Sequence, residues 1–290
     1  MKQLVIISGK GGTGKTTVAA SFAALSGRCV LVDADVDAAN LHLIIEHEVR
    51  ESDVFMSGKE AVISQESCAG CGMCRRLCRF DAISPDFRVD PLACEGCGVC
   101  ARACPAEAIT MIDRECGRWF VAEAPIGAFV YARLDAAAEN SGKLVSLVRE
   151  KAGEEAGRRN IGLVIVDGPP GVGCPVIASM TGGNAVLIVT EATASGLHDL
   201  KRAAELSRHF KVPTFAVVNK ADLHEQKTAE IEAWCRDNGI TAIGRIPFDP
   251  RVVEAMTAGK VLVGDSESVA AAAVLKIWNR LCSETGLPYA

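Results

Sequence analysis

The sequence is poor in aromatic residues, in long hydrophobic runs and in excess positive charge. Only 5% of its 290 residues are aromatic, and its formal net charge is -5. A surface that binds nucleic acid usually needs a basic surplus, so we expect no nucleic acid as an obligatory partner. Residues 269–275, the longest apolar run of the C-terminal helical stretch, number seven, whereas a membrane-spanning helix needs about 20. We therefore expect no membrane insertion.

Signals for secretion and for histidine metal sites are also missing. The apolar stretch at the N-terminus is too short for a secretory signal, which predicts a cytoplasmic protein, and the five histidines show no ligand spacing. Cysteine, in contrast, is abundant, because eight of the 13 cysteines lie between Cys68 and Cys104. Such clustering indicates bound metal rather than disulfides.

Short apolar runs, with helical patterns between the later ones, predict buried parallel strands. The runs cover residues 3–8, 29–33, 162–167, 185–190, 214–219 and 241–246. Alternating strands and helices favour an α/β fold with an open, mostly parallel sheet covered on both faces. The interval 62–113 lacks such periodicity, so we expect one domain from 1–61 and 114–290 and a small domain inserted at 62–113.

The insertion repeats itself at an offset of 26 residues. The spacing C-x2-C-x2-C-x3-C occurs at Cys68, Cys71, Cys74 and Cys78, and again at Cys94, Cys97, Cys100 and Cys104. This spacing suits two 4Fe-4S clusters in which the last cysteine of each run binds the other cluster. One cluster would bind Cys68, Cys71, Cys74 and Cys104, and the other Cys94, Cys97, Cys100 and Cys78.

Two other interpretations of these cysteines stay open. C-x2-C pairs also bind zinc, and two clusters could serve only as structural staples for a segment that is too small to bury a core. The segment resembles bacterial two-cluster ferredoxins, including Pro105 after the last cysteine, but Arg79 stands where the first run should have proline. The resemblance implies an inserted ferredoxin-like α+β domain.

The sequence from Gly9 to Thr16 fits the phosphate-binding loop G-x-x-x-x-G-K-[ST], between a predicted strand and a predicted helix. Backbone N–H groups of the loop and the helix N-terminus bind phosphates in such a loop, Lys15 reaches the terminal phosphates, and the Thr16 hydroxyl binds Mg2+. The expected nucleotide-binding residues here are Gly9, Gly11, Gly12, Thr13, Gly14, Lys15, Thr16 and Thr17.

The loop KGGTGKTT resembles the deviant Walker A loop of the MinD/ParA/Mrp class of ATPases, and LVDADVDAANL and IVDGPPG resemble its two switches. This resemblance implies an ATP-hydrolysing dimer in which Lys10 reaches the phosphates bound by the facing subunit. It further implies that Asp35 positions the attacking water, that Asp33 supports the magnesium shell, and that Asp167 holds Mg2+ through water. Lys10, Lys15 and Asp35 are therefore the expected catalytic residues.

Loops at the ends of later strands predict where the base binds, because open α/β sheets receive nucleotides there. We expect Asn219 and Lys220, in VVNKAD, and Pro247 and Asp249, in IPFDP, to contribute. NKAD also fits the N-K-x-D pattern that binds guanine in GTPases. The resemblance to ATPases favours ATP, and GTP remains the alternative.

Taken together, the motifs resemble MinD-superfamily ATPases with an inserted ferredoxin domain, which are related to Mrp-type iron–sulfur proteins. The chain departs from these relatives because Cys282 is alone near the C-terminus, no basic helix follows, and Cys174 has no second cysteine suited to a bridging cluster. We expect a Mg2+-dependent ATPase, a homodimer or a heterodimer with a paralogue, that couples ATP hydrolysis to electron transfer through two 4Fe-4S clusters to a redox or iron–sulfur acceptor protein. The alternatives are an iron–sulfur carrier or assembly ATPase and a redox-sensing, MinD-like positioning or regulatory ATPase.

Overall fold

The computed structural model describes residues 1–288 apart from 136, 137, 139 and 140. Its contacts divide the chain into two compact units. The larger unit comprises Met1–Ser52, Trp119–Arg133 and Ser141–Ala290, and the smaller unit comprises Asp53–Arg118 and Leu134–Asn140. The interval 62–113 lies within the smaller unit.

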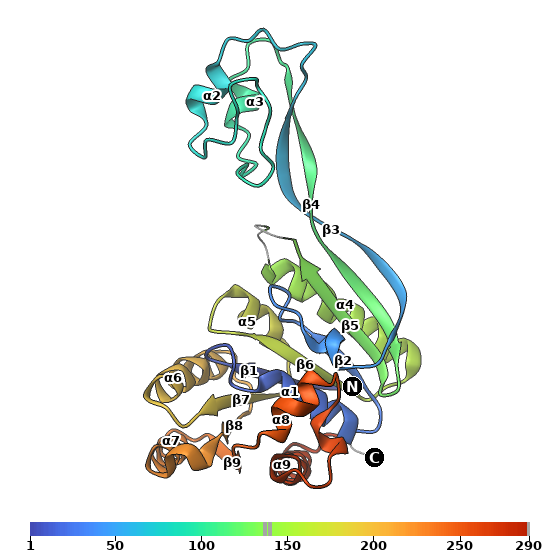
Figure 1. The fold of residues 1–290 in the computed structure, drawn as a ribbon, viewed down its shortest axis with the longest axis vertical. Coiled ribbons are helices and arrows are strands. Elements are labelled where there is room, and N and C mark those ends of the chain that lie inside the picture. The colour runs from blue at the N-terminus through green and yellow to red at the C-terminus, as the bar shows by residue number, and fades with distance from the viewer. Residues whose placement is uncertain (136–137, 139–140, 289–290) are drawn as a thin grey trace. The chain divides into compact units, whose positions relative to one another are not determined.

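The larger unit is built on a mainly parallel sheet (Figure 1). The strands are β1 (Lys2–Ser8), β2 (Cys29–Asp33), β3 (Glu48–Ile63), β4 (Ile109–Ala124), β5 (Gly127–Leu134), β6 (Leu163–Pro170), β7 (Ala185–Glu191), β8 (Thr214–Asn219) and β9 (Thr241–Ile246). They are ordered β3-β4-β5-β2-β6-β1-β7-β8-β9, and the neighbours from β5 to β9 pair in parallel. All six predicted strands are present, and the predicted α/β fold is confirmed.

Helices cover both faces of this sheet (Figure 1). They are α1 (Lys15–Leu25), α4 (Ser141–Arg159), α5 (Cys174–Met180), α6 (Ala194–His209), α7 (Glu225–Asp237), α8 (Arg251–Thr257) and α9 (Val269–Thr285), with 3-10 turns η1 (Leu41–Leu43), η2 (Ala221–His224) and η3 (Leu262–Gly264). The helices α1 and α9 pack together, with the rings of Phe22 and Trp278 4.9 Å apart. The helices α4 and α5 contact each other and the strands β2 and β6.

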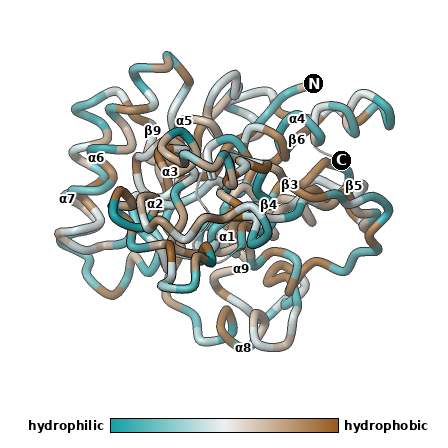
Figure 2. Tube along the Cα trace, turned by 90° about the horizontal axis from the view of Figure 1, so that it is seen from above, coloured by the Kyte–Doolittle hydropathy of each residue, from teal (hydrophilic) through white to brown (hydrophobic). Residues whose placement is uncertain are grey.

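The alternation of side chains along each strand explains why helices cover both faces of the sheet. Leu4 and Ile6 share one apolar cluster with Phe22 and Trp278, whereas Val5, equally buried, points to the opposite face because successive strand side chains alternate. The helix α6 buries residues at intervals of three or four positions, and teal and brown segments alternate along it in Figure 2. Amphipathic helices therefore cover an apolar sheet, as the sequence predicted.

The smaller unit contains the helices α2 (Met73–Leu77) and α3 (Val99–Arg102) and parts of β3 and β4. Its apolar core is small, and the cysteines belong to it. The buried members are Ala61, Ile63, Cys74, Ala82, Ile83, Cys94 and Ile109. The sequence analysis did not predict β3, β4 or β5. The strand β3 is exposed along much of its length and lacks a buried apolar run, whereas β5 has five buried residues in succession and was missed in spite of that pattern.

The backbone of the smaller unit repeats at the same offset as its sequence. Gly72 and Gly98 precede the two helices with φ of 73° and 71°. The hydrogen bond from Ser64 N–H to the Ala108 carbonyl matches the one from Asp90 N–H to the Ala82 carbonyl, with the roles of the two repeats exchanged. The two copies thus fold alike and pair with each other.

Candidate functional site: a nucleotide site and two cysteine cavities

The loop of residues 9–14 joins the carboxyl end of β1 to α1. Gly14 has a φ of 89°, a left-handed conformation that glycine adopts without strain. A side chain at Gly9 would collide with Asp199, and one at Gly14 would collide with the amide of Asn219. Close packing requires glycine at both positions, and the left-handed backbone conformation also requires it at Gly14.

Lys15, the first residue of α1, is 6% exposed and faces a group of carboxylates. Its Nζ donates to Asp167 Oδ1 at 2.7 Å and lies 3.6 Å from Asp35 Oδ2. Burial alone would lower the pKa of Lys15, but the attraction of the carboxylates, Asp167 first, outweighs burial and raises it. The lysine therefore stays charged at neutral pH, where a phosphate would meet a cation already held in place.

Asp33 is fully buried at the end of β2. Its carboxylate accepts hydrogen bonds from the backbone N–H groups of Asp35 at 3.2 Å and of Asn40 and Leu41 at 3.0 Å each. Burial, reinforced by repulsion from Asp167, raises the pKa of Asp33 to about 7. In this structure Asp33 holds the first switch segment together, and its predicted part in the magnesium shell stays a prediction.

The two carboxylate oxygens of Asp167 differ in their hydrogen bonding. Oδ1 accepts from Lys15, whereas Oδ2 is buried and has no hydrogen-bond partner among the residues that the structure describes. A buried acceptor without a donor costs free energy. A water bound to Mg2+ would donate to this oxygen, since Mg2+ usually retains several of its waters. The donor set therefore fits the predicted magnesium site.

A cavity above the loop is open to solvent and spans about 1070 Å³ of space free of protein atoms. Its lining includes the predicted residues Gly11, Gly12, Thr13, Gly14, Lys15, Thr16, Thr17 and Asp35. The sequence analysis gave no site role to the other lining residues, Ser8, Asp37, Ala38, Asn40, Pro169, Pro170, Pro175 and Met256. Most of these lie in the two switch motifs, which could have identified them, whereas nothing in the sequence pointed to Met256 of α8.

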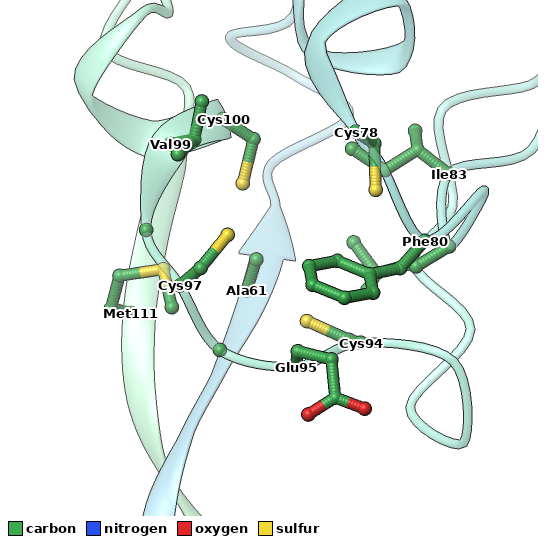
Figure 3. A pocket seen from close by; sticks show the side chains of 14 residues that line it. Ala61, Cys78, Phe80, Ile83, Cys94, Glu95, Cys97, Val99, Cys100 and Met111 are labelled. Atoms are coloured by element: carbon green, nitrogen blue, oxygen red, sulfur yellow. The ribbon is translucent and has the colours of Figure 1, made fainter.

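The smaller unit contains two cavities, each lined by four cysteines. Cys78, Cys94, Cys97 and Cys100 line one of them, and Figure 3 shows their sulfur atoms turned toward its interior. Cys68, Cys71, Cys74 and Cys104 line the other. Each cavity thus combines three cysteines of one run with the last cysteine of the other, the same grouping that the spacing predicted for crossed ligation.

The cysteines are free thiols. Within the described ranges, no three His, Cys, Asp or Glu side chains converge closely enough to hold a single metal ion. Burial raises the pKa of the Cys74 thiol, and a hydrogen bond from the backbone N–H of Arg75 acts against this rise. The same pair of effects acts on Cys100, through the N–H of Ala101. Each cavity therefore offers thiols together with a backbone donor to sulfur.

Comparisons with known proteins identify the family. The family model described as the CobQ/CobB/MinD/ParA nucleotide binding domain matches residues 4–263. The chain belongs to this family. An uncharacterized protein of Methanocaldococcus jannaschii is 33% identical to this MinD/ParA-type chain over 284 residues, 96% of each chain. A second uncharacterized protein of that organism is 24% identical over 292 residues, 90% of this chain and 92% of its own.

Solved structures share the fold at low sequence identity. The cell division ATPase MinD of Pyrococcus furiosus has a TM-score of 0.57 and 19% identity, covering 98% of this chain and 99% of its own. MinD of Pyrococcus horikoshii with Mg-ADP has a TM-score of 0.58 and 18% identity, covering 99% and 98%. An ATP complex of a Cyanothece McdA variant has a TM-score of 0.59 and 17% identity, covering 100% and 98%. The MinD/ParA-type chain is a nucleotide-binding P-loop ATPase.

In this MinD/ParA-type chain Lys10 is engaged outside the cavity. Its Nζ lies 3.1 Å from Glu191 Oε2 and 3.4 Å from Ser195 Oγ. Lys220 donates to the other oxygen of Glu191 at 2.7 Å. Burial alone would raise the pKa of Glu191, but hydrogen bonds from the two lysines lower it. Glu191, which the sequence analysis missed, therefore restrains Lys10 and a predicted base-binding residue together.

Of the other residues predicted to bind the base, one lies beside the phosphate loop and two lie outside the lining of the nucleotide cavity. Asn219 donates from Nδ2 to the Thr13 carbonyl at 2.7 Å, so it supports the phosphate loop directly. Asp249 accepts from Ser268 Oγ at 2.6 Å and from the Ala270 N–H at 3.2 Å, which fixes the start of α9. Pro247 does not line the cavity. Base binding by Asn219, Lys220, Pro247 and Asp249 stays a prediction.

The described residues of the MinD/ParA-type chain include no helix with both the length and the apolar character needed to cross a membrane.

Proposed function

We propose that the chain is a MinD/ParA-type switch that dimerises around ATP and Mg2+, and that its ATPase cycle responds to the redox state of two 4Fe-4S clusters in its smaller unit. The observation that carries this proposal is the presence, in one chain, of an ATP site and two cavities each lined by four cysteines. The likeness to MinD ATPases favours a switch over an electron carrier as the primary role.

Hydrolysis in this proposal depends on positioning and charge neutralisation. Lys15 and the loop N–H groups would hold the phosphates, the Thr16 hydroxyl and, through water, Asp167 would hold Mg2+, and Asp35 would orient the attacking water. The oxygen of that water bonds to the γ-phosphorus as the bond from the γ-phosphorus to the β–γ bridging oxygen breaks, so ADP and inorganic phosphate leave and the proton of the water passes to the phosphate. Lys10 of one subunit reaches the phosphates bound by the other, so it must first leave Glu191.

The cysteine cavities fit 4Fe-4S clusters because each offers four thiols, an apolar surrounding and a backbone N–H to sulfur. Hydrogen bonds to the sulfurs and the local charge tune the potential of such a cluster. When bound, each cluster would accept and release one electron. The eight cysteines and the small core around them would hold the clusters and limit the access of water.

The test begins with anaerobic purification and measurement of iron, acid-labile sulfide and the electron paramagnetic resonance spectrum. Two clusters require about eight irons and eight sulfides per chain. ATP hydrolysis and dimer formation are then measured with oxidised and with reduced protein. We expect a several-fold difference between the two states. Zinc in place of iron, or the same rate and the same dimer fraction in both states, would contradict the proposal.

Electron transfer gated by ATP is the second candidate, favoured by the exposure of Cys71 and Cys97, one at each cavity. It predicts cluster potentials, or electron-transfer rates, that differ between ADP and a non-hydrolysable ATP analogue. A carrier role predicts instead that iron and sulfide pass to an apo acceptor protein. Retention of both during incubation with such an acceptor would exclude the carrier role.

A further inference from the structure

The short helix α2 has a buried side and an exposed side. Cys74 is buried and lines a cysteine cavity. On α2 and in the turn that follows it, three apolar side chains are 36% to 45% exposed, and three arginines are exposed beside them. We call these six residues the α2 surface: Met73, Arg75, Arg76, Leu77, Arg79 and Phe80.

The internal repeat provides a comparison within the molecule. The second copy has the same backbone but smaller residues at four of these positions. Arg75, Leu77, Arg79 and Phe80 correspond to Ala101, Ala103, Pro105 and Ala106. Since the second copy folds without large or charged side chains there, the fold does not require them. The first copy therefore carries a basic and apolar surface for another reason.

Among the residues that the structure describes, no ion pair neutralises the arginines of the α2 surface. Arg88, elsewhere in the same unit, pairs with Asp86 at 3.0 Å. Over the described part of the chain, no carboxylate lies within ion-pair distance of Arg75, Arg76 or Arg79. Three positive charges within five positions thus stand on a protein of net charge -5. Charge of this kind steers an oppositely charged partner.

The α2 surface also lies close to both cysteine cavities. Met73 lines the cavity of Cys68, Cys71, Cys74 and Cys104, and Phe80 lines the other cavity, where Figure 3 shows its ring beside Cys78 and Cys94. A protein bound to this surface would contact side chains that themselves form the cavity walls. Few atoms would then separate its redox centre from either cluster.

We infer that the α2 surface is the docking site of an acidic one-electron carrier, a protein with clustered carboxylates around its own flavin or iron–sulfur centre. The apolar side chains supply contact area, and the arginines supply attraction and orientation. One electron passes from the reduced carrier to one oxidised cluster, so that the carrier is oxidised by one electron as the cluster is reduced. This inference rests on the proposed function, because it requires the clusters.

The experiment measures the rate at which an acidic flavodoxin, reduced to its hydroquinone, reduces the cluster-loaded full-length protein in an anaerobic stopped-flow instrument. We expect the second-order rate constant to fall about tenfold or more between low and high salt, because steering between surface charges is screened. The triple variant Arg75→Gln, Arg76→Gln, Arg79→Gln should lose a similar factor at low salt. The matched variant Arg88→Gln should react like the unchanged protein.

Iron content and reduction by methyl viologen radical, a small cation that needs no docking site, show whether the variants keep their clusters. Full iron content, normal reduction by the viologen and slow reduction by flavodoxin in the triple variant would support the docking site. Full iron content and an unchanged flavodoxin rate would overturn the docking site but not the proposed function. Absence of iron from the unchanged protein would overturn both.

Discussion

The two units of this chain are stabilised in different ways. The larger unit buries long apolar side chains such as Leu4, Ile6 and Phe22 completely, between the sheet and the helices that cover one of its faces. The smaller unit has a core of a few small or medium side chains in which Cys74 and Cys94 are themselves members. Burial of apolar surface can hold the first unit together, whereas the second has too little of it.

The nucleotide site and the cysteine cavities also differ in what holds them in shape. At the nucleotide site Lys15 and Asp167 form a buried ion pair. At the cysteine cavities the thiols surround space that no protein atom fills. We therefore expect the nucleotide site to be largely independent of its ligand for its shape, and the smaller unit to depend on bound clusters for its stability.

The largest expected effect comes from removing the charge of Lys15. It distinguishes the two units because it should affect ATP hydrolysis but not iron content. Lys15→Ala should lower ATP hydrolysis about 10²- to 10³-fold, because it deletes the preorganised cation at the phosphates. Iron content should not change. Steady-state phosphate release and an iron assay measure the two outcomes, and Lys276→Ala, an exposed lysine of α9, is the control. A parallel loss of iron would show that the units are not independent.

The next prediction tests the smaller unit. Cys74→Ala should remove at least half of the bound iron and lower the unfolding temperature of this unit, since structural metal contributes directly to folding. The control is Cys116→Ser, because Cys116 is also buried in the smaller unit but donates to the Ser57 carbonyl rather than lining a cavity. Equal iron in both variants would contradict the assignment of Cys74.

Some parts of the fold and of the sites could be predicted from the sequence, and others could not. The phosphate loop and the two cysteine groups could be predicted because their residues are close together in the chain or repeat at a fixed offset. The strands β1, β2, β6, β7 and β8 could be predicted because each contains a continuous apolar run. The strand β9 was predicted although Arg245 interrupts it, and β5 was missed although it is an apolar run. The strand β3 could not, because charged residues occupy much of its exposed length.

Contacts between distant segments were the main omission. Glu191 meets Lys10 and Lys220 only because the ends of β7 and β8 lie beside the phosphate loop, a proximity that no local pattern indicates. Asp33 was predicted to support magnesium, and the structure adds that it accepts the N–H groups of Asn40 and Leu41. That role depends on the path of the loop between them, which spacing alone does not give.

We expect a smaller effect from a substitution of Glu191, which pairs with both Lys10 and Lys220. Glu191→Gln should weaken the hold on Lys10 and allow the proposed dimer to form at about two- to fivefold lower ATP concentration, since a partly exposed ion pair contributes up to about 1 kcal/mol. Analytical ultracentrifugation across an ATP titration measures this change. Glu205→Gln, an exposed position of α6, should leave the dimer unchanged. A higher ATP requirement in Glu191→Gln would mean that Glu191 supports the dimer instead.

The last substitution concerns Asp249 and distinguishes a structural carboxylate from a base-binding one. Asp249→Asn should lower the free energy of unfolding by about 1 to 2 kcal/mol, since it weakens the bonds that fix the start of α9, and should leave the KM for ATP unchanged. Denaturant unfolding followed by tryptophan fluorescence measures the first outcome, with the exposed Asp237→Asn as control. A raised KM would instead support the predicted base contact.

The carboxylate of Asp249 also predicts how the stability difference between the unchanged protein and Asp249→Asn depends on pH. The hydrogen bond from Ser268, followed by those from the Ala270 and Arg251 N–H groups, lowers the pKa of Asp249 below its ordinary 3.8. A group with a lowered pKa in the folded protein stabilises it above the unfolded pKa and loses that contribution as the pH falls through the folded one. The stability gap between the unchanged protein and Asp249→Asn should therefore be full at pH 7 and shrink below about pH 4. A gap that persisted at pH 2 would mean that shape rather than charge at this position fixes α9.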